Sequence, residues 1–304
     1  MYNKLTFKAV KELAAPHTWV ASIFPVLLGT LLACAFGHSF NLLIFLGTLA
    51  VSVLLQSAVN TLNDYMDFVK GADDATNCPD AHDAAMVYHN INPKTALGVA
   101  IVFIALAAVL GLLLCLASSF WLLLFGAFGL PILLFYSAGP LPISYTPLGE
   151  ITSGFVMGGI ITMAVYYALT VSFEPMVLYY ASPLILTIGL IMLTNNGCDI
   201  IKDKEASRHT LPILLGQKNT KLLLIIGFIL AILMVAHLGF WHFHYGSPLA
   251  IIMAIHCFFY LKAYLKIPLD LAHRRQALGT TLKLVKTINI YYLLIILAEV
   301  LLNG

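Results

Sequence analysis

Long apolar stretches separated by short polar ones set the pattern of this 304-residue chain. A helix needs about 20 mostly apolar residues to cross the roughly 30 Å of hydrocarbon in a bilayer. Nine stretches of about this length are present, and each predicts a transmembrane helix. They cover residues 18–37, 42–62, 96–117, 119–136, 150–171, 176–196, 221–239, 247–265 and 286–302. The third and fourth come from a single apolar run, which we divide near residue 118 as a tight helical hairpin.

The composition agrees with this pattern. Hydrophobic residues make up 61% of the chain and charged residues only 10%, whereas charged residues are about 25% of a typical soluble domain. The bilayer must therefore be the solvent for most of the surface. We expect an all-α, polytopic membrane protein whose single transmembrane domain covers residues 1–304. The formal net charge of +2 gives no reason to expect a nucleic-acid partner.

Basic residues indicate the sidedness of the helices, because Lys and Arg near helix ends accumulate on the cytoplasmic side. All 16 lie before the first predicted helix, or at or after the ends of the second, sixth and eighth. The connections on the other side, 38–41, 172–175 and 240–246, contain none. The pattern predicts a multi-pass protein of the cell membrane with a cytoplasmic N-terminus and no signal peptide. Residues 267–283 are expected to form a polar cytoplasmic loop.

A first acidic motif follows the second predicted helix. Its members are Asn60, Asn63, Asp64, Asp67, Lys70 and Asp73. The first four are separated by steps of three and four, so they share one face if the helix continues through them.

A second acidic motif follows the sixth predicted helix. Its members are Asn195, Asn196, Asp199, Lys202, Asp203 and Arg208. Asn195, Asp199 and Asp203 are four residues apart and again share one helical face. Because both motifs lie at helix ends on the same side of the membrane, we expect them to face each other.

Carboxylates placed close together raise one another's pKa, and a cation between them removes this cost. Carboxylate oxygens suit Mg²⁺, which typically binds through one or two carboxylates together with substrate phosphates and waters. We predict a Mg²⁺ site whose catalytic residues and metal ligands are Asp64, Asp67, Asp199 and Asp203. The predicted contacts to a substrate diphosphate are Asn60, Asn63, Lys70, Asp73, Asn195, Asn196, Lys202 and Arg208.

At these residues the chain resembles the UbiA superfamily of intramembrane prenyltransferases, and within it the MenA branch of 1,4-dihydroxy-2-naphthoate polyprenyltransferases. Residues 63–73 are similar to the first aspartate-rich motif of that branch. Residues 195–216 are similar to its second motif and the TLxxxLG string that follows. Residues 136–150 and 25–29 resemble its YTGGPxPLxxxxLGE and PVLLG segments.

The resemblance implies a nine-helix bundle that transfers a polyprenyl group from an allylic diphosphate to an aromatic acceptor with the help of Mg²⁺. The implied acceptor is 1,4-dihydroxy-2-naphthoate, a quinone precursor of menaquinone biosynthesis. Tyr136 and Tyr145 are then expected to line the substrate cavity. The implied partners are these two substrates and the lipid bilayer.

Two departures from the branch leave alternatives open. Cys198 stands where the branch usually has arginine, and residues 75–93 lack its arginine-rich string. The alternatives within the superfamily are other acceptors: 4-hydroxybenzoate, haem, chlorophyllide, homogentisate or a sugar phosphate. A cation-coupled transporter and a catalytically silent binding protein are alternatives from other classes. Transporters usually place polar helix breaks near the bilayer midplane, whereas both motifs here lie at helix ends.

Overall fold

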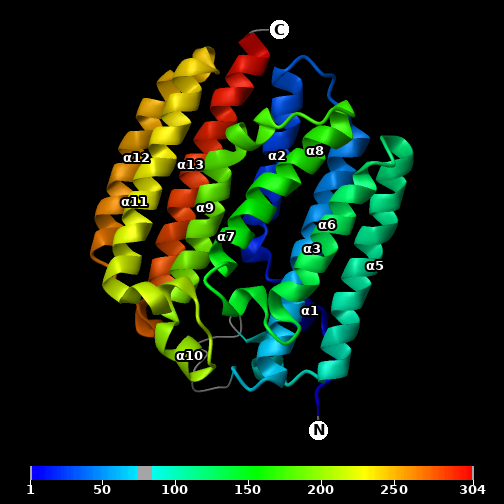
Figure 1. Cartoon of the computed structure of the whole chain (residues 1–304), viewed down its shortest axis with the longest axis vertical. Helices are drawn as coiled ribbons and strands as arrows, with labels where there is room; N and C mark the ends of the chain where they lie inside the picture. The colour runs from blue at the N-terminus through cyan, green and yellow to red at the C-terminus, as the bar shows by residue number, and fades with distance from the viewer. Residues whose placement is uncertain (1, 74–83, 303–304) are drawn as a thin grey trace.

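The computed structural model describes residues 2–73 and 84–302. Within these residues all regular structure is helical, apart from one isolated β-bridge between Asn3 and Ile91. The all-α prediction is therefore confirmed. In Figure 1 the long helices run roughly along the long axis of a bundle, with the N-terminus at one end and the C-terminus at the other.

The α-helices follow the predicted apolar segments in order. Their bounds are α1 Phe7–Ala14, α2 Val20–Ala35, α3 Leu42–Val69, α4 Ala85–His89, α5 Pro93–Ala117, α6 Leu122–Ser137, α7 Gly149–Ser153, α8 Ile161–Thr170, α9 Met176–Cys198, α10 Ile200–Glu205, α11 Leu211–Trp241, α12 Pro248–Leu265 and α13 Arg274–Leu302. Shorter turns complete the set: η1 Pro16–Thr18, η2 Ile143–Tyr145, η4 His244–Gly246 and η5 Leu271–His273. A π-helical segment, η3 Gly154–Ile160, joins α7 to α8 into one continuous element.

Seven helical elements of the described residues are long and apolar enough to cross a membrane. An eighth is obtained if Phe7–Thr18 and Val20–Ala35, which meet at an angle of 54°, form one bent span. The fourth predicted segment corresponds to α6, which has 16 residues and is about 24 Å long. A helix of this length is shorter than the hydrocarbon layer, so the number nine stays a prediction.

Local sequence signals explain where several helices begin. The side chain of Asn41 accepts hydrogen bonds from the backbone N–H groups of Leu43 and Ile44 at the start of α3. Asn92 caps α5 in the same way, and Pro93 occupies the first helical position, where its missing N–H costs nothing.

The structure corrects two predicted boundaries. The last helix begins at Arg274 rather than at residue 286, so most of the predicted polar loop 267–283 is helical. The seventh predicted helix begins at Leu211, ten residues before residue 221, and is broken at Gly216 (φ 75°, ψ 161°). A search for apolar stretches misses such ends, because a helix that continues beyond the hydrocarbon carries polar residues there.

Helix α9 lies inside the bundle, where it packs against α11, α13 and η3. Glycines allow η3 to approach α9 closely: an added Cβ at Gly158 would lie 2.6 Å from the backbone of Ile185. Small residues at such contacts are typical of membrane helices. Helix α2 packs against α8 and α13, and α3 packs against α5.

The outward faces of the long helices are apolar. Large exposed hydrophobic side chains occur along α5, α11 and α12, for example Leu112, Ile226 and Ile255. These faces suit contact with lipid. The two acidic motifs instead lie at the C-terminal ends of α3 and α9 and in α10, at the end of the bundle where Figure 1 also places the N-terminus. The chain is therefore an integral membrane protein whose polar centre lies at one end.

Candidate functional site

The first acidic motif occupies the last turns of α3. This helix continues without a break to Val69, so Asn63, Asp64 and Asp67 belong to one helical segment, as the sequence predicted. Gly71 then adopts φ 69°, a conformation that glycine reaches without steric cost. The turn lets the backbone carbonyl of Asp67 accept from the N–H groups of Ala72 (2.8 Å) and Asp73 (3.3 Å), which brings Asp73 back beside the helix end.

The second acidic motif is divided between two helices. Asn195 and Asn196 lie in the last turn of α9, and Asp203 lies in the short helix α10. Asp199 separates the two helices with φ −100° and ψ 13°. A continuous helix through Asn195, Asp199 and Asp203 is therefore interrupted at Asp199.

Arg208 connects the two motifs. Its Nη2 forms an ion pair with Asp67 Oδ1 of the first motif, and its Nη1 lies 3.3 Å from Asp203 Oδ1 of the second. Burial lowers the pKa of Arg208, but the carboxylates of Asp67 and Asp203 outweigh burial and raise it, so the guanidinium stays protonated. A second cross-connection pairs Lys202 Nζ with Asp73 Oδ1 at 2.6 Å. The structure thus brings the two motifs together.

Tyr145 lies between two of the basic side chains. Arg208 Cζ is 4.6 Å and Lys70 Nζ is 4.5 Å from the centre of its ring, within the range of a cation–π interaction. Its backbone carbonyl accepts a hydrogen bond of 2.8 Å from the N–H of His209. Beside it is a cavity of about 310 Å³, lined by Lys70, Tyr145, Lys202 and Glu205 together with small residues of both motifs. The lining offers two ammonium groups to an anion.

The amides of the motifs hold different parts of the site. Asn63 Nδ2 donates to Asp67 Oδ2 at 3.3 Å, and its Oδ1 accepts from Ser137 Oγ at 2.9 Å. Asn196 Nδ2 donates to Glu150 Oε1 at 2.9 Å. These bonds orient the two amides toward neighbouring helices.

Asn60 is placed apart from the other predicted contacts. Its Nδ2 donates to the carbonyl of Ala14 (3.0 Å) and to Thr18 Oγ1 (2.8 Å). The amide therefore joins α3 to the segment that follows α1. Its role as a diphosphate contact stays a prediction.

Tyr136 lies near the end of α6, in the last turn before Ser137. Its hydroxyl oxygen is buried, and it is close enough to Glu150 and Arg208 to interact with them electrostatically. Both predicted tyrosines therefore border the two motifs.

Three polar residues of the site received no role from the sequence: Ser137, Glu150 and Arg274. Arg274 donates from Nη2 to Asn195 Oδ1 at 2.7 Å, and its Nε lies 3.3 Å from Asp199 Oδ1. Arg274 is 75 residues beyond Asp199 in the sequence, in the segment that was predicted to be a loop. For Glu150 the sequence did carry a signal, because an acid at the start of an apolar helix indicates a functional site.

Three of the four predicted metal ligands are engaged by basic side chains: Asp67 and Asp203 by Arg208, and Asp199 by Arg274. Within residues 2–73 and 84–302, no group of three or more His, Cys, Asp or Glu side chains is arranged to hold a metal ion. Yet one buried oxygen each of Asp64 (Oδ1) and Asp203 (Oδ2) has no hydrogen-bond partner among these residues. Burial, with the nearby carboxylates of Asp199 and Asp67, raises the pKa of Asp203 to about 7 against the lowering effect of Arg208.

Such a donor set fits Mg²⁺. This ion usually takes only one or two protein carboxylates and completes its coordination with substrate phosphates and waters. A preformed cluster of three protein ligands is therefore not required. Part of the segment 75–93, whose basic residues differ from the MenA pattern, lies outside the described residues.

Residues 22–296 match the UbiA prenyltransferase family, a match that covers most of the chain. The chain belongs to the UbiA prenyltransferase family.

Individual UbiA proteins agree with this assignment. The chain is 39% identical over 227 residues to 1,4-dihydroxy-2-naphthoate octaprenyltransferase of Bacillus subtilis, with 75% of this chain and 72% of that protein covered. It is 31% identical to the protein of the same name from Mycobacterium tuberculosis, with 69% and 70% covered. The predicted resemblance is confirmed, and the chain is a prenyltransferase.

The UbiA fold is also seen in solved structures. A UbiA homolog from Archaeoglobus fulgidus bound to DMAPP and Mg²⁺ superimposes with a TM-score of 0.64. The two sequences are 16% identical, and the superposition covers 94% of this chain and 98% of that one. At this identity the likeness concerns the fold alone.

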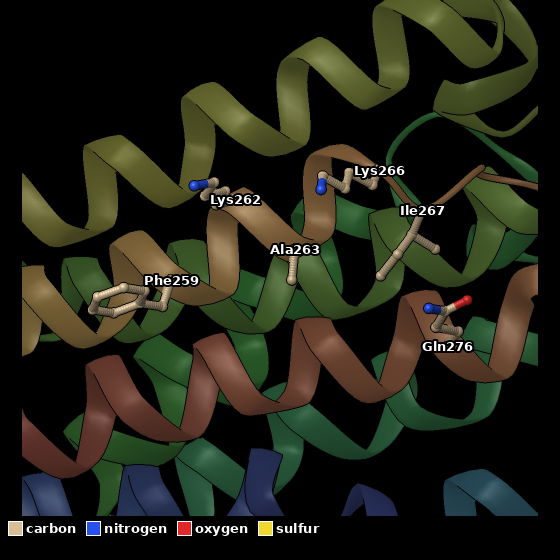
Figure 2. A pocket seen from close by; sticks show the side chains of 6 residues that line it. All are labelled: Phe259, Lys262, Ala263, Lys266, Ile267 and Gln276. Carbon is tan, nitrogen blue, oxygen red and sulfur yellow. The ribbon is translucent and has the colours of Figure 1, made fainter.

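A second cavity, of about 420 Å³, lies between the end of α12 and the start of α13. Figure 2 shows Lys262 on α12, Lys266 directly after the end of α12 and Gln276 on α13 around it. Its lining contains no residue of either acidic motif and no carboxylate. This cavity therefore lacks the donors that a UbiA-type cation and diphosphate site needs.

Proposed function

We propose that this protein transfers a polyprenyl group from an allylic diphosphate to 1,4-dihydroxy-2-naphthoate, in a Mg²⁺-dependent reaction of menaquinone biosynthesis. The meeting of the two acidic motifs through Arg208 is the observation that carries the proposal, because it creates one polar centre from two distant segments. Two relatives with the name 1,4-dihydroxy-2-naphthoate octaprenyltransferase support the acceptor. The fold neighbour bound to DMAPP and Mg²⁺ supports the donor class and the metal.

The residues that would hold Mg²⁺ are the aspartates of the two motifs. Asp64 and Asp203 each have a buried oxygen without a hydrogen-bond partner among the described residues, and Asp67 and Asp199 flank them in sequence. When bound, the ion neutralises the diphosphate and favours its departure as a leaving group.

The basic side chains have the task of holding the anion. Lys70 and Lys202 line the cavity beside Tyr145, and Arg208 presents a planar guanidinium suited to phosphate oxygens. In the reaction the bond between the allylic carbon and the diphosphate oxygen breaks, and the electron pair leaves with the diphosphate. The aromatic ring supplies the pair for the new carbon–carbon bond and regains its aromaticity when the attacked carbon releases a proton or, at the carboxylated position, CO₂. The surrounding apolar helices exclude water, which would otherwise capture the allylic cation.

We also propose nine membrane crossings, with the N-terminus and the acidic motifs on the cytoplasmic side. The support is the distribution of Lys and Arg, which places all 16 on the side of the motifs. The short helix α6 and the bent pair α1–α2 then complete the nine. Cysteine labelling of loops 172–175 and 240–246 from outside intact cells tests this arrangement.

Another acceptor is the main competing function, and one experiment addresses it together with the transporter. The purified protein is incubated with a labelled polyprenyl diphosphate and a panel of aromatic acceptors, with Mg²⁺ or with EDTA, and the products are identified by mass spectrometry. We expect a prenylated product of the naphthoate, at the level of a demethylmenaquinone, with Mg²⁺ and none with EDTA. A prenylated product formed from a different acceptor would show that the naphthoate assignment is wrong. Cation-driven uptake without any prenylated product would show that the protein is a transporter instead of an enzyme.

A further inference from the structure

Arg274 connects the last long helix to the second acidic motif. It is the first residue of α13. Its Nη2 is 2.7 Å from Asn195 Oδ1, and its Nε is 3.3 Å from Asp199 Oδ1. The side chains of Arg274 and Asp199 are only 13% and 10% exposed. One guanidinium therefore holds two side chains that lie on either side of the end of α9.

The segment before Arg274 is fastened to α11 by Lys221. The ammonium group of Lys221 donates to the carbonyl of Tyr264 at 2.6 Å and to that of Ile267 at 2.7 Å. It also lies 3.8 Å from the centre of the Tyr264 ring. These contacts fix the end of α12 and the beginning of the connection to α13.

The rest of this connection is packed against the motif itself. Leu269 is 3% exposed, and Gln217 donates to its carbonyl. The side chain of Leu269 packs directly against Gly197, where an added Cβ would lie 2.3 Å from Leu269 Cδ2. Asp270 then orders the turn before Arg274 by accepting from the backbone N–H of His273 at 2.9 Å. The connection from α12 to α13 is therefore held in a defined conformation by contacts with α11 and with the second acidic motif.

From these contacts we propose that Arg274 is a positioning residue, which sets the side chains of Asn195 and Asp199 for the cation and diphosphate. The proposal deepens the proposed function and rests on it for the identity of the ligands. A planar guanidinium suits this task, because its nitrogens lie in a fixed geometry, so that one donates a hydrogen bond to Asn195 while another forms an ion pair with Asp199. Groups that orient the ligands of a metal typically change metal affinity or activity by about 10–100-fold when they are removed.

The neighbouring Arg275 provides a matched control. It is exposed, and the described residues show no hydrogen bond or ion pair to it. Replacing Arg274 or Arg275 removes the same charge from the same end of α13. A difference between the two variants therefore reports the contacts of Arg274 rather than the net charge.

The test measures Mg²⁺ dependence in two ways, with Arg274→Ala, Arg274→Lys and Arg275→Ala in the full-length purified protein. The first readout is the Mg²⁺ concentration that half-saturates the thermal stabilisation given by an unreactive polyprenyl thiolodiphosphate. The second is the Mg²⁺ concentration for half-maximal prenyl transfer, with separate kcat and KM values. Melting temperatures without ligand establish that each variant is folded.

We expect Arg274→Ala to need about 10–100-fold more Mg²⁺ in both readouts and Arg275→Ala to match the wild type. Arg274→Lys should fall between them, since a single ammonium cannot reproduce the two-point contact. Equal Mg²⁺ requirements for all three variants and the wild type would overturn the proposal. If Arg274→Ala fails to fold, the folded Arg274→Lys variant provides the test: a Mg²⁺ requirement equal to that of the wild type would also overturn the proposal. The binding readout decides the role of Arg274 even if the naphthoate acceptor gives no product, so the two failures are distinguishable.

Discussion

Arg208 and Arg274, whose side chains are only 12% and 13% exposed, meet the acidic motifs in different ways. Arg208 belongs to the second motif and reaches across to the first, where it pairs with Asp67 as well as with Asp203. Arg274 comes from the start of α13 and contacts the second motif through Asn195 and Asp199. Arg208 also faces Tyr145, which lines the cavity of about 310 Å³. Arg274 instead follows the connection from α12 to α13, whose first part is held by hydrogen bonds from Lys221 of α11.

This difference separates two tasks that both need a positive charge. A guanidinium beside a cavity can exchange its carboxylate partners for the oxygens of an entering diphosphate. A guanidinium at the end of a fixed connection can only keep its acceptors in place. We therefore expect Arg208 to govern binding of the prenyl diphosphate and Arg274 to govern the Mg²⁺ requirement.

The largest effect should come from removing the carboxylates themselves. Asp67→Ala and Asp199→Ala each remove the partner of one arginine and a predicted metal ligand. We expect kcat to fall by about 10²–10³-fold in both, the range found when a group that stabilises developing charge is lost. Steady-state prenyl transfer measures the change, with Glu174→Ala as the control, because Glu174 lies in the predicted outer loop 172–175. Unchanged turnover in either aspartate variant would show that the motif containing that aspartate takes no part in the reaction.

The contacts of Arg208 and Arg274 can be predicted from the sequence to different extents. The contacts of Arg208 join motifs whose helix spacing is visible in the sequence, so the two acidic segments could be expected to meet. The contact of Arg274 depends on how α12 and α13 turn at the end of the bundle. No local pattern marks it, and the polar residues there are equally expected of a cytoplasmic loop.

The apolar pattern itself was informative about helices and less so about their ends. Every predicted apolar segment overlaps a helix, because burial in lipid demands a continuous hydrogen-bonded backbone. The starts at Leu211 and Arg274 were missed, since hydropathy falls where a helix leaves the bilayer. Asn60 shows a related limit: its spacing fits the motif, but its amide bonds to Ala14 and Thr18.

The second prediction concerns Arg208. Arg208→Ala should raise the KM for the prenyl diphosphate by about 10–100-fold, because charge-assisted contacts to phosphate contribute roughly 1.5–3 kcal/mol each. It also leaves Asp67 and Asp203 without their shared partner, and breaking a buried pair costs about 3–5 kcal/mol of stability. The melting temperature should therefore fall and should recover in part with Mg²⁺.

The exposed Lys204 of α10 is the control for Arg208. Lys204→Ala should leave both the KM and the melting temperature near their wild-type values. If Arg208→Ala changed the Mg²⁺ requirement instead of the KM, the two arginines would have the same task and the proposed division would be wrong.

A third prediction uses pH. The pKa of Asp203 is raised to about 7, first by burial and then by neighbouring carboxylates. Below this pH the folded protein carries a proton on Asp203 that a cation must displace, and above it the carboxylate is free to bind. Competition by a single proton predicts that the Mg²⁺ concentration for half-maximal activity rises about tenfold between pH 8 and pH 6. Mg²⁺ titrations of activity at the two pH values measure this change, and a requirement independent of pH would exclude Asp203 as a ligand.

The smallest effect should come from the support behind Arg274. Lys221→Met keeps much of the side-chain length but leaves the carbonyls of Tyr264 and Ile267 without the ammonium donor. Buried acceptors without a partner cost about 1–3 kcal/mol, so the melting temperature should fall.

Because the loosened connection delivers Arg274, the Mg²⁺ requirement should rise by a few-fold in Lys221→Met, in the same direction as in Arg274→Ala. Lys218→Met is the matched control, since Lys218 is exposed one turn earlier on α11. A lower melting temperature with an unchanged Mg²⁺ requirement would mean that Lys221 stabilises the fold without positioning Arg274. A shift in both quantities would instead extend the path of positioning contacts from α11, through the connection between α12 and α13, to Asp199.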